Sequence, residues 1–210
     1  MPNEAVKELM GVVVEKTKVD IQGTKFKADG PLLITHWGMS GPAILKLSAF
    51  GARTLSEQNY NFKVRVNWAN ELNNEIVNNT LKTLIEAHPK KQLSNLRPTY
   101  IPQRLWLYLL NKKEISAERK GEDIGKKIIN KLTTALTNDV YNVSGKTTFK
   151  EEFVTCGGVS LESINMKTME SKVCPNLYFT GEVMDVDAIT GGYNFQAAWT
   201  TAYIAGQLLT

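Results

Sequence analysis

The chain has 210 residues, of which 42% are hydrophobic and 22% are charged, and its formal net charge at pH 7 is +4. This composition is ordinary for a globular protein of one domain or two small ones. No stretch approaches the roughly 18 uninterrupted apolar residues of a membrane span, and the first residues include acids where a signal peptide would be apolar. The sequence therefore excludes a membrane-spanning helix and predicts a cytoplasmic protein.

The first seventy residues have the pattern of a β-meander followed by a helix and one more strand. Alternation of apolar and polar residues, with glycine and proline between the runs, predicts strands. Pro42 suits a first helical turn and Gly51 a helix end. The predicted strands cover residues 11–16, 19–22, 24–27, 32–35 and 60–68, and the predicted helix covers residues 42–51.

Apolar residues recur at helical spacing through the middle of the chain. Three helices are predicted, at residues 72–88, 102–110 and 124–136. Pro89 ends the first of these helices and Pro102 begins the second. Trp106 falls on an apolar face, which favours a core role over a stacking platform. Strand character returns at residues 140–143, so the three helices form an insertion between strands.

The helical insertion is the most basic part of the chain. Between Lys90 and Lys131 there are eleven basic residues and four acidic ones, a local net charge of +7 that leaves −3 for the rest. A solvated helix surface is the favoured interpretation, because no base-stacking motif accompanies these charges. Contact with nucleic acid or another anion is the alternative.

Near its end, the chain reads as a strand, a polar loop and a helix. Leu177–Phe179 form a short apolar run, Thr180–Glu182 interrupt it, and Gly191-Gly192 precede a helix with an apolar side. That side consists of Phe195, Ala198, Trp199, Ala202, Tyr203 and Ala205. Small residues on the same helix would allow close packing against a sheet.

This segment has the features of a cofactor crevice in an open α/β sheet. Gly191 and Gly192 leave backbone N–H groups accessible where the helix dipole adds partial positive charge. The Glu182 carboxylate would accept hydrogen bonds from sugar-like hydroxyls. A plain strand–loop–helix connection, with the glycines serving only the turn, explains the same residues equally well.

Few other residues are candidates for catalysis, redox chemistry or metal binding. Cys156 and Cys174 lack the spacing of metal or redox sites, and a free buried cysteine is the favoured interpretation of Cys156. With only His36 and His88, no histidine-based zinc site is expected, and no metal site is predicted. His36 follows a strand on a loop, where it would either face a substrate or hold the loop through a backbone hydrogen bond.

Five ordered blocks resemble one family. The chain is similar to the bacterial FAD-dependent oxidoreductases that include aminoacetone oxidase and the bile-acid-inducible flavoproteins, over residues 35 to 206. The blocks are Thr35-His36-Trp37-Gly38-Met39-Ser40-Gly41-Pro42, Thr155-Cys156-Gly157-Gly158-Val159, Thr168-Met169-Glu170-Ser171-Lys172, Gly181-Glu182-Val183-Met184-Asp185-Val186-Asp187 and Thr190-Gly191-Gly192-Tyr193-Asn194.

The resemblance implies an α+β fold made of a β-barrel-like inserted domain, a three-helix subdomain and the C-terminal segment of a split Rossmann-like FAD domain. No G-x-G-x-x-G phosphate loop occurs in the chain. The ADP-binding half of the FAD domain is therefore expected to be absent. The implied divisions are residues 1–70 and 138–153 for the β-rich domain, 71–137 for the helices, and 154–210 for the FAD-domain segment.

The resemblance also assigns roles to residues. Glu182, with Gly181, would meet the ribityl hydroxyls, and Gly157, Gly158 and Val159 would let the backbone approach the ring. Thr190, Gly191, Gly192, Tyr193 and Asn194 would lie at the pyrimidine edge of the isoalloxazine. His36 is the candidate catalytic residue. Asp185 and Asp187 are weaker candidates, and Ala188 stands where the family pattern has glycine.

The function expected from this resemblance is that of part of an FAD-dependent, NAD(P)H-linked oxidoreductase acting on a small molecule. FAD binding by the chain alone is expected to be weak or absent, and catalysis would need the ADP-binding half in cis or in trans. A non-catalytic binding domain and a basic nucleic-acid-associated protein are the alternatives. The apolar edge at Leu177–Phe179 would be uncovered, which predicts dimerisation, a rearranged C-terminus or poor solubility.

Overall fold

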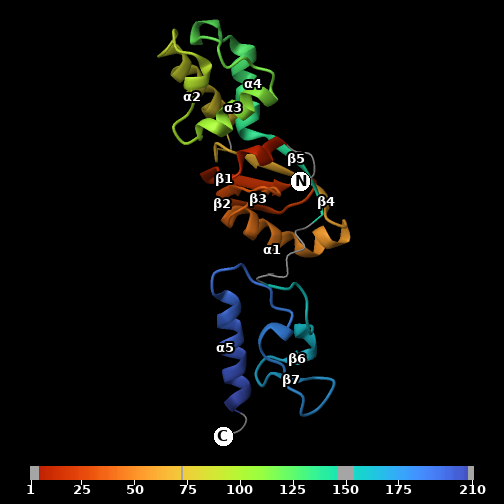
Figure 1. The fold of residues 1–210 in the computed structure, drawn as a ribbon. Helices are drawn as coiled ribbons and strands as arrows, with labels where there is room; N and C mark the ends of the chain where they lie inside the picture. Colours follow the sequence, from red (N-terminus) through yellow and green to blue (C-terminus); the bar gives the residue numbers. More distant parts are fainter. Residues whose placement is uncertain (1–4, 72, 146–153, 208–210) are drawn as a thin grey trace. The chain divides into compact units, whose positions relative to one another are not determined.

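The computed structural model describes residues 5–71, 73–145 and 154–207, and the chain divides into two compact units (Figure 1). The first unit comprises residues 1–47 and 55–147, and the second comprises residues 48–54 and 148–210. No helix in these described ranges is both long and apolar enough to cross a membrane.

The first unit is built on an antiparallel sheet of five strands in the order β3-β2-β1-β4-β5. The register pairs Val13 with Leu33, Lys18 with Asn67, and Val66 with Asp139. Its strands are β1 (Val13–Ile21), β2 (Lys27–Ile34), β3 (Met39–Ser40), β4 (Asn61–Asn67) and β5 (Asp139–Ser144).

Two expectations for this sheet need correction. The two strands predicted at residues 11–16 and 19–22 are parts of one continuous strand, β1 (Val13–Ile21), whose register shifts between Val14 and Thr17. Such an irregularity interrupts the apolar–polar alternation without ending the strand, so the sequence pattern suggested two strands. Residues 24–26 lie in the turn before β2, not in a strand of their own.

Helix α1 (Pro42–Glu57) runs past Gly51, where the sequence predicted its end. Leu55 beyond that glycine is buried in the core of the first unit, so packing outweighs the local preference of glycine. Gly41, just before the helix, has a φ of +97°, and a Cβ there would lie 2.9 Å from the Pro31 carbonyl oxygen. Only glycine fits this connection from β3 to α1.

The helical insertion contains α2 (Asn74–Glu86), α3 (Gln103–Lys112) and α4 (Lys126–Thr137), close to the predicted ranges. Asn73 caps α2 by accepting a hydrogen bond from the Glu75 N–H at 2.9 Å. Trp106 is fully buried and its Nε1 donates to the Leu93 carbonyl at 2.7 Å, which confirms its core role. Short 3₁₀ turns lie at Ala5–Leu9, Leu93–Asn95 and Gly121–Asp123.

A buried carboxylate joins the insertion to the sheet. Asp139, at the start of β5, is 1% exposed and accepts hydrogen bonds from Trp68 Nε1 at 3.0 Å and from the Tyr141 hydroxyl. Lys112, the last residue of α3, reaches the same carboxylate at 2.7 Å. The group is shared between α3, β5 and the segment after β4, so it fixes where the insertion attaches.

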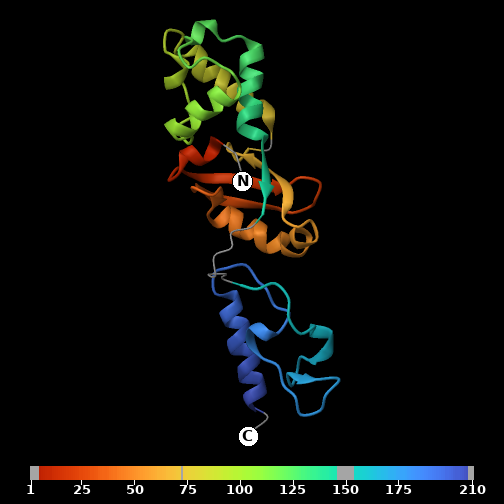
Figure 2. The same cartoon turned by 45° about the vertical axis from the view of Figure 1, so that its right-hand side comes forward.

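The second unit is small and rich in loops, and α5 (Tyr193–Gly206) is its longest element (Figure 2). Its core consists of Ile164, Met169 and Met184, with partly buried Val159, Phe179, Val186, Ile204 and Ala205 around them. Its other elements are β6 (Ile164–Asn165), β7 (Glu170–Ser171) and 3₁₀ turns at Leu161–Ser163 and Gly181–Val183.

The strand predicted at Leu177–Phe179 does not form. Tyr178 makes an isolated bridge to Glu170, and the Leu177 carbonyl and Phe179 N–H bond to Ser171 and Met169. A strand needs a neighbour along its length, and in the described part of the chain this run finds only the two-residue β7. The Rossmann-like character of residues 154–210 stays a prediction.

Candidate functional site

Backbone hydrogen bonds bring two of the predicted site segments together in the second unit. The Val159 N–H donates to the Val183 carbonyl at 2.8 Å, and the Asp185 N–H donates to the Val159 carbonyl at 3.0 Å. This parallel bridge places Gly157–Val159 beside Gly181–Asp185. No pattern in the sequence indicated this pairing, because neither segment belongs to a regular strand.

The two glycines before Val159 have different surroundings. A Cβ on Gly158 would lie 2.6 Å from the Met184 carbonyl carbon, so this glycine lets two backbones meet. A Cβ on Gly157 would meet nothing within 4 Å. Gly157 therefore leaves open space beside the backbone, whereas Gly158 has a packing role whatever else it does.

Glu182 lies in the 3₁₀ turn Gly181–Val183, and its carboxylate is exposed. Across the described ranges its one hydrogen bond is a long one of 3.4 Å, accepted by Oε1 from the Thr155 N–H. Gly181 is held from the other side, where its N–H donates to the Thr201 hydroxyl of α5 at 3.1 Å. The turn is thus fixed to α5 while the carboxylate stays available to a ligand.

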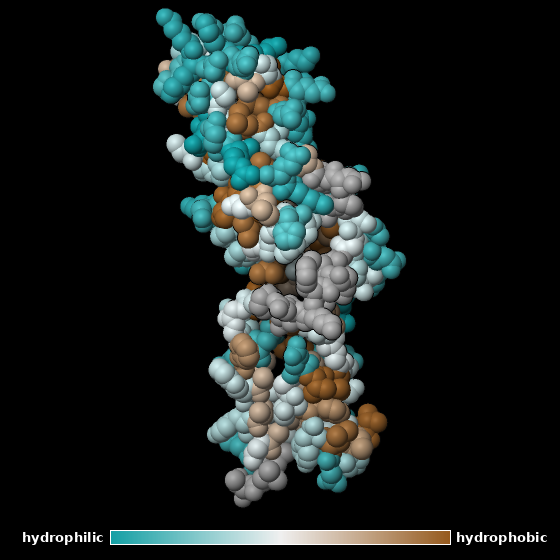
Figure 3. All heavy atoms as spheres, viewed as in Figure 1, coloured by the Kyte–Doolittle hydropathy of each residue, from teal (hydrophilic) through white to brown (hydrophobic). Residues whose placement is uncertain are grey.

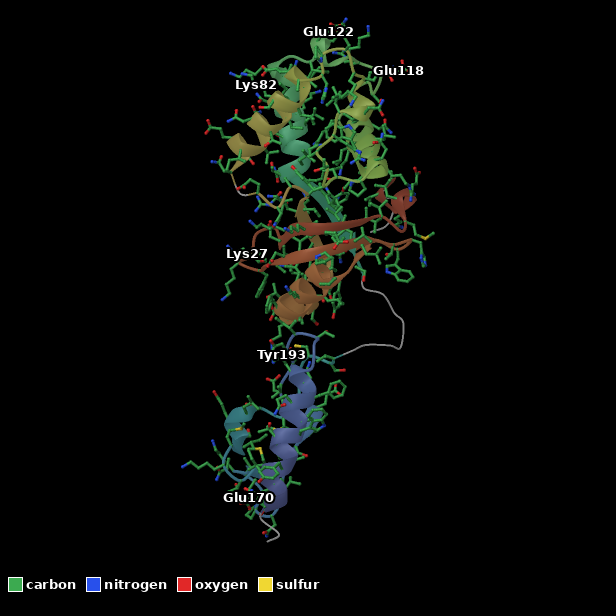
Figure 4. The ribbon with its side chains drawn as sticks, turned by 90° about the vertical axis from the view of Figure 1, so that its left-hand side faces the viewer. Lys27, Lys82, Glu118, Glu122, Glu170 and Tyr193 are labelled. Carbon is green, nitrogen blue, oxygen red and sulfur yellow. The ribbon has the colours of Figure 1, made fainter. Side chains whose placement is uncertain are left out.

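The start of α5 is open. Gly191 and Gly192 have φ values of +139° and +98°, and a Cβ on either would meet nothing within 4 Å. Gly192 is the N-cap, and no side chain of the described residues caps the helix. The first N–H groups of a helix lack intrahelical acceptors and carry partial positive charge. This helix start, marked by Tyr193 in Figure 4, therefore offers donors beside unfilled space.

Asn194 holds the loop that precedes α5. Its Oδ1 accepts from the Ala188 N–H at 2.8 Å, and its Nδ2 donates to the Ala188 carbonyl at 2.9 Å. The amide side chain thereby fixes the loop path at the position where the family pattern has glycine. Thr190, Gly191 and Gly192 follow this fixed point and are exposed.

Both cysteines are exposed, so the expectation of a buried Cys156 is wrong. The Cys156 thiol is hydrogen-bonded to Asp187, and this bond, with a smaller contribution from burial, raises the pKa of Cys156. The thiol therefore stays protonated at neutral pH and lacks the thiolate character of a nucleophile. The loop around the Gly157–Val159 bridge buries too little surface to cover it.

His36 lies in the other unit, in the tight turn that joins β2 to β3. Backbone bonds between Thr35 and Gly38 close this turn, at 2.8 and 3.3 Å, so the imidazole is not what holds it. The His36 ring is exposed and packs edge-on against Trp37, with ring centroids 3.9 Å apart. Its catalytic role stays a prediction.

The second unit therefore offers a flat cofactor several fitting features. Gly157, Gly191 and Gly192 leave space that any Cβ would fill, the start of α5 presents N–H donors, and Glu182 presents an exposed carboxylate. Donors at a helix start suit an acceptor that gains negative charge, and a carboxylate suits hydroxyl groups. These kinds of group suit a flat ring that accepts hydrogen bonds and a chain that carries hydroxyl groups.

Comparison with known proteins gives a consistent family. Residues 1–154 match the profile of the HI0933-like protein barrel and H2TH domain. The chain is 34% identical over 209 residues to a protein of Escherichia coli (strain K12) named ribosomal RNA dihydrouridine synthase, covering 97% of this chain and 48% of that protein. A protein of the same name from Haemophilus influenzae is 31% identical over 200 residues, covering 93% and 45%.

A third relative has a different name. It is a 3-dehydro-bile acid delta(4,6)-reductase from Clostridium scindens, 29% identical over 178 residues, covering 85% of this chain and 43% of that protein. This chain thus spans about half the length of the curated relatives it matches.

Proposed function

The chain belongs to the HI0933-like family, and from that premise we propose that it is the C-terminal part of an FAD-dependent, NAD(P)H-linked oxidoreductase. In this proposal residues 154–210 form the isoalloxazine and ribityl side of the flavin site. The first unit, with His36 as the candidate catalytic residue, would bind the substrate.

The observation that carries the proposal is the open helix start at Gly191 and Gly192. When bound there, a reduced flavin would supply hydride to a substrate carbon, and NAD(P)H would reduce it again. The N–H groups that begin α5 would stabilise negative charge at the pyrimidine edge of the ring. Glu182 would orient the ribityl chain, and Asn194 would keep Gly191 and Gly192 in position by holding Ala188.

The names of the relatives suggest the reaction class. One relative is named for making dihydrouridine and another is named a delta(4,6)-reductase, so both, by name, reduce carbon–carbon double bonds. We propose the same reaction class here, at a double bond conjugated to a carbonyl group. Hydride from the reduced flavin would add to the carbon distant from the carbonyl, the C=C π bond would break, and a proton from solvent would add to the carbon beside the carbonyl, with NAD(P)H as the reductant. Two of the three relatives act, by name, on ribosomal RNA, so a uracil base within RNA is the proposed substrate.

One face of α5 indicates that the second unit binds a partner. Phe195, Trp199 and Tyr203 recur every fourth residue and are 68%, 67% and 69% exposed. The Phe195 and Trp199 rings stack on each other, with centroids 6.1 Å apart. Contiguous exposed aromatic surface marks an interface. We propose that it is covered by an ADP-binding half corresponding to the remaining length of the relatives, and a homodimer through this face is the alternative.

The proposal is tested by filling the space beside α5. In the chain assembled with a complementary ADP-binding half, Gly191→Ala and Gly192→Ala should each lower the FAD content. Gly23→Ala is the matched control, because Gly23 also has a positive φ, +80°, and open space at its Cβ position, but it lies in the β1–β2 turn. FAD content unchanged in both site variants, with helix content also unchanged, would overturn the assignment.

A further inference from the structure

The helical insertion carries a hollow that the flavin chemistry does not use. Its volume is about 540 Å³, and four lysines line it, Lys112 and Lys113 at the end of α3 and Lys127 and Lys131 on α4. We propose that this lysine hollow binds the phosphate backbone of RNA. The inference rests on the RNA substrate proposed above, but binding there requires no flavin.

Three of the four lysines form no ion pair among the described residues. Lys112 is paired with the buried Asp139. No ion pair joins Lys113, Lys127 or Lys131 to any acid in the described ranges. Glu114 also lines the hollow, but it forms no ion pair with these lysines. The hollow therefore has uncompensated positive charge that suits a polyanion.

The positions of these lysines disfavour the helix itself. Lys127 and Lys131 are four residues apart on α4, and like charges at that spacing repel each other. Lys127 also lies in the first turn, where the helix dipole favours an acidic residue and none is present. Neither residue is therefore placed to stabilise α4, and an anionic ligand would offset the repulsion.

The lining favours RNA over a lipid surface. Asn130 and Thr134 lie on the same face of α4 as the two lysines, and no apolar side chain among the described residues lines the hollow. Binding in a membrane interface needs apolar side chains to insert, whereas amide and hydroxyl groups beside lysines suit phosphates and ribose hydroxyls. The surface over α2–α4 is largely hydrophilic in the view of Figure 3.

The decisive variant is Lys127→Glu with Lys131→Gln, tested on the full chain with a fluorescent RNA hairpin. Losing two phosphate contacts should reduce the slope of log affinity against log salt by about 1.4 to 1.8. Affinity at low salt should fall by roughly tenfold. Because an acidic side chain suits the first turn of α4 better than a lysine does, the thermal midpoint should stay equal or rise. Weaker RNA binding with an equal or higher thermal midpoint would show that the variant has lost binding and has not misfolded.

The matched control is Lys63→Glu on β4, an exposed lysine of the same unit outside the hollow. This variant also replaces a lysine by glutamate, but outside the hollow, and it should alter RNA affinity by less than about twofold. Glu114→Gln removes the one acid that lines the hollow within the described ranges and should strengthen RNA binding by about twofold to threefold. An increase on removing this acid is not expected from a merely structural role.

Other outcomes would overturn the proposal. The first is failure of the wild-type chain to bind the hairpin at about 50 mM salt. The second is a double variant whose RNA affinity and salt slope equal those of the wild type. A third is binding to phosphatidylglycerol vesicles, sensitive to the same lysines, without binding to RNA. Because no arm needs flavin, failure here leaves the flavin assignment standing, and loss of FAD binding leaves this result unaffected.

Discussion

Lys112 Nζ lies 2.7 Å from Asp139 Oδ1, at the point where the helical insertion meets the sheet. The aspartate is 1% exposed, and the ammonium group also lies 3.8 Å from the centroid of the Tyr141 ring. Asp139 is thus a buried charge whose one cationic partner in the described ranges comes from a different element. The pair makes the placement of α3 depend on the first residue of β5.

Lys112→Met should destabilise the first unit strongly. The substitution keeps an unbranched side chain of nearly the same length but leaves a buried carboxylate without its cation, which costs about 3 kcal/mol. Denaturant unfolding at pH 7 measures the loss. Lys82→Met is the control (Lys82 is labelled in Figure 4). Lys82 Nζ and Glu86 Oε1 are 3.9 Å apart and both side chains are exposed, so the loss should be about 0.5 kcal/mol or less. Equal losses in the two variants would show that the buried pair is not structural.

Tyr141 should make the first unit sensitive to alkali. Burial, and then the neighbouring Asp139, raise the pKa of Tyr141 well above the ordinary 10.0. The unfolded chain ionises first, so the free energy of unfolding should fall as pH rises above 10.0, by up to about 1.4 kcal/mol per pH unit. Below pH 10.0 the contribution of Tyr141 to the free energy of unfolding is fully present. Tyr141→Phe should flatten this decline, whereas Tyr178→Phe, on an exposed tyrosine, should not.

Much of the first unit could be predicted from local patterns. Periodicity and the two prolines located α2, α3 and α4 to within a few residues, because these helices bury continuous apolar faces. The Asp139 group could not be predicted, since Trp68 and Asp139 are 71 positions apart and Lys112 and Asp139 are 27 apart. The full length of α1 was missed because a tertiary contact of Leu55 outweighs Gly51.

Gly158 and Gly157 should respond differently to alanine. At Gly158 the added Cβ would overlap backbone atoms of Val183 and Met184, so Gly158→Ala should separate the two site segments and cost about 3 kcal/mol. At Gly157 the space is open and the cost is the strained φ of +115° alone, about 1 to 2 kcal/mol. Thermal unfolding monitored at Trp199 compares them, and equal destabilisation would argue against the bridge at Val159.

Asn194→Ala should loosen the loop before α5. It removes both hydrogen bonds to Ala188, which should make local opening about 1 to 2 kcal/mol easier and speed proteolytic cleavage of residues 185–192 roughly tenfold. Gln196→Ala serves as control, because among the described residues the Gln196 side chain bonds only to Thr200, on the exposed surface of α5. Equal cleavage rates for Asn194→Ala and the wild type would refute a positioning role for Asn194.

For the candidate site, the sequence indicated which residues to consider, but it did not indicate the contacts that these residues make. Gly191 and Gly192 do precede a helix with an uncapped start, as the glycine pair indicated. The bridge between Val159 and Met184 and the clamp of Asn194 on Ala188 depend on loop paths that no periodicity encodes. The predicted strand at Leu177–Phe179 failed for a related reason, since strand propensity needs a partner strand to be realised.

The most direct measurement is flavin absorbance at constant protein concentration, for the chain alone and for the chain co-purified with a complementary ADP-binding half. If residues 154–210 form one side of a flavin site, the chain alone should bind little or no FAD, and each assembled complex should bind one FAD. Stoichiometric FAD in the isolated chain, or a stable complex without flavin, would contradict this assignment.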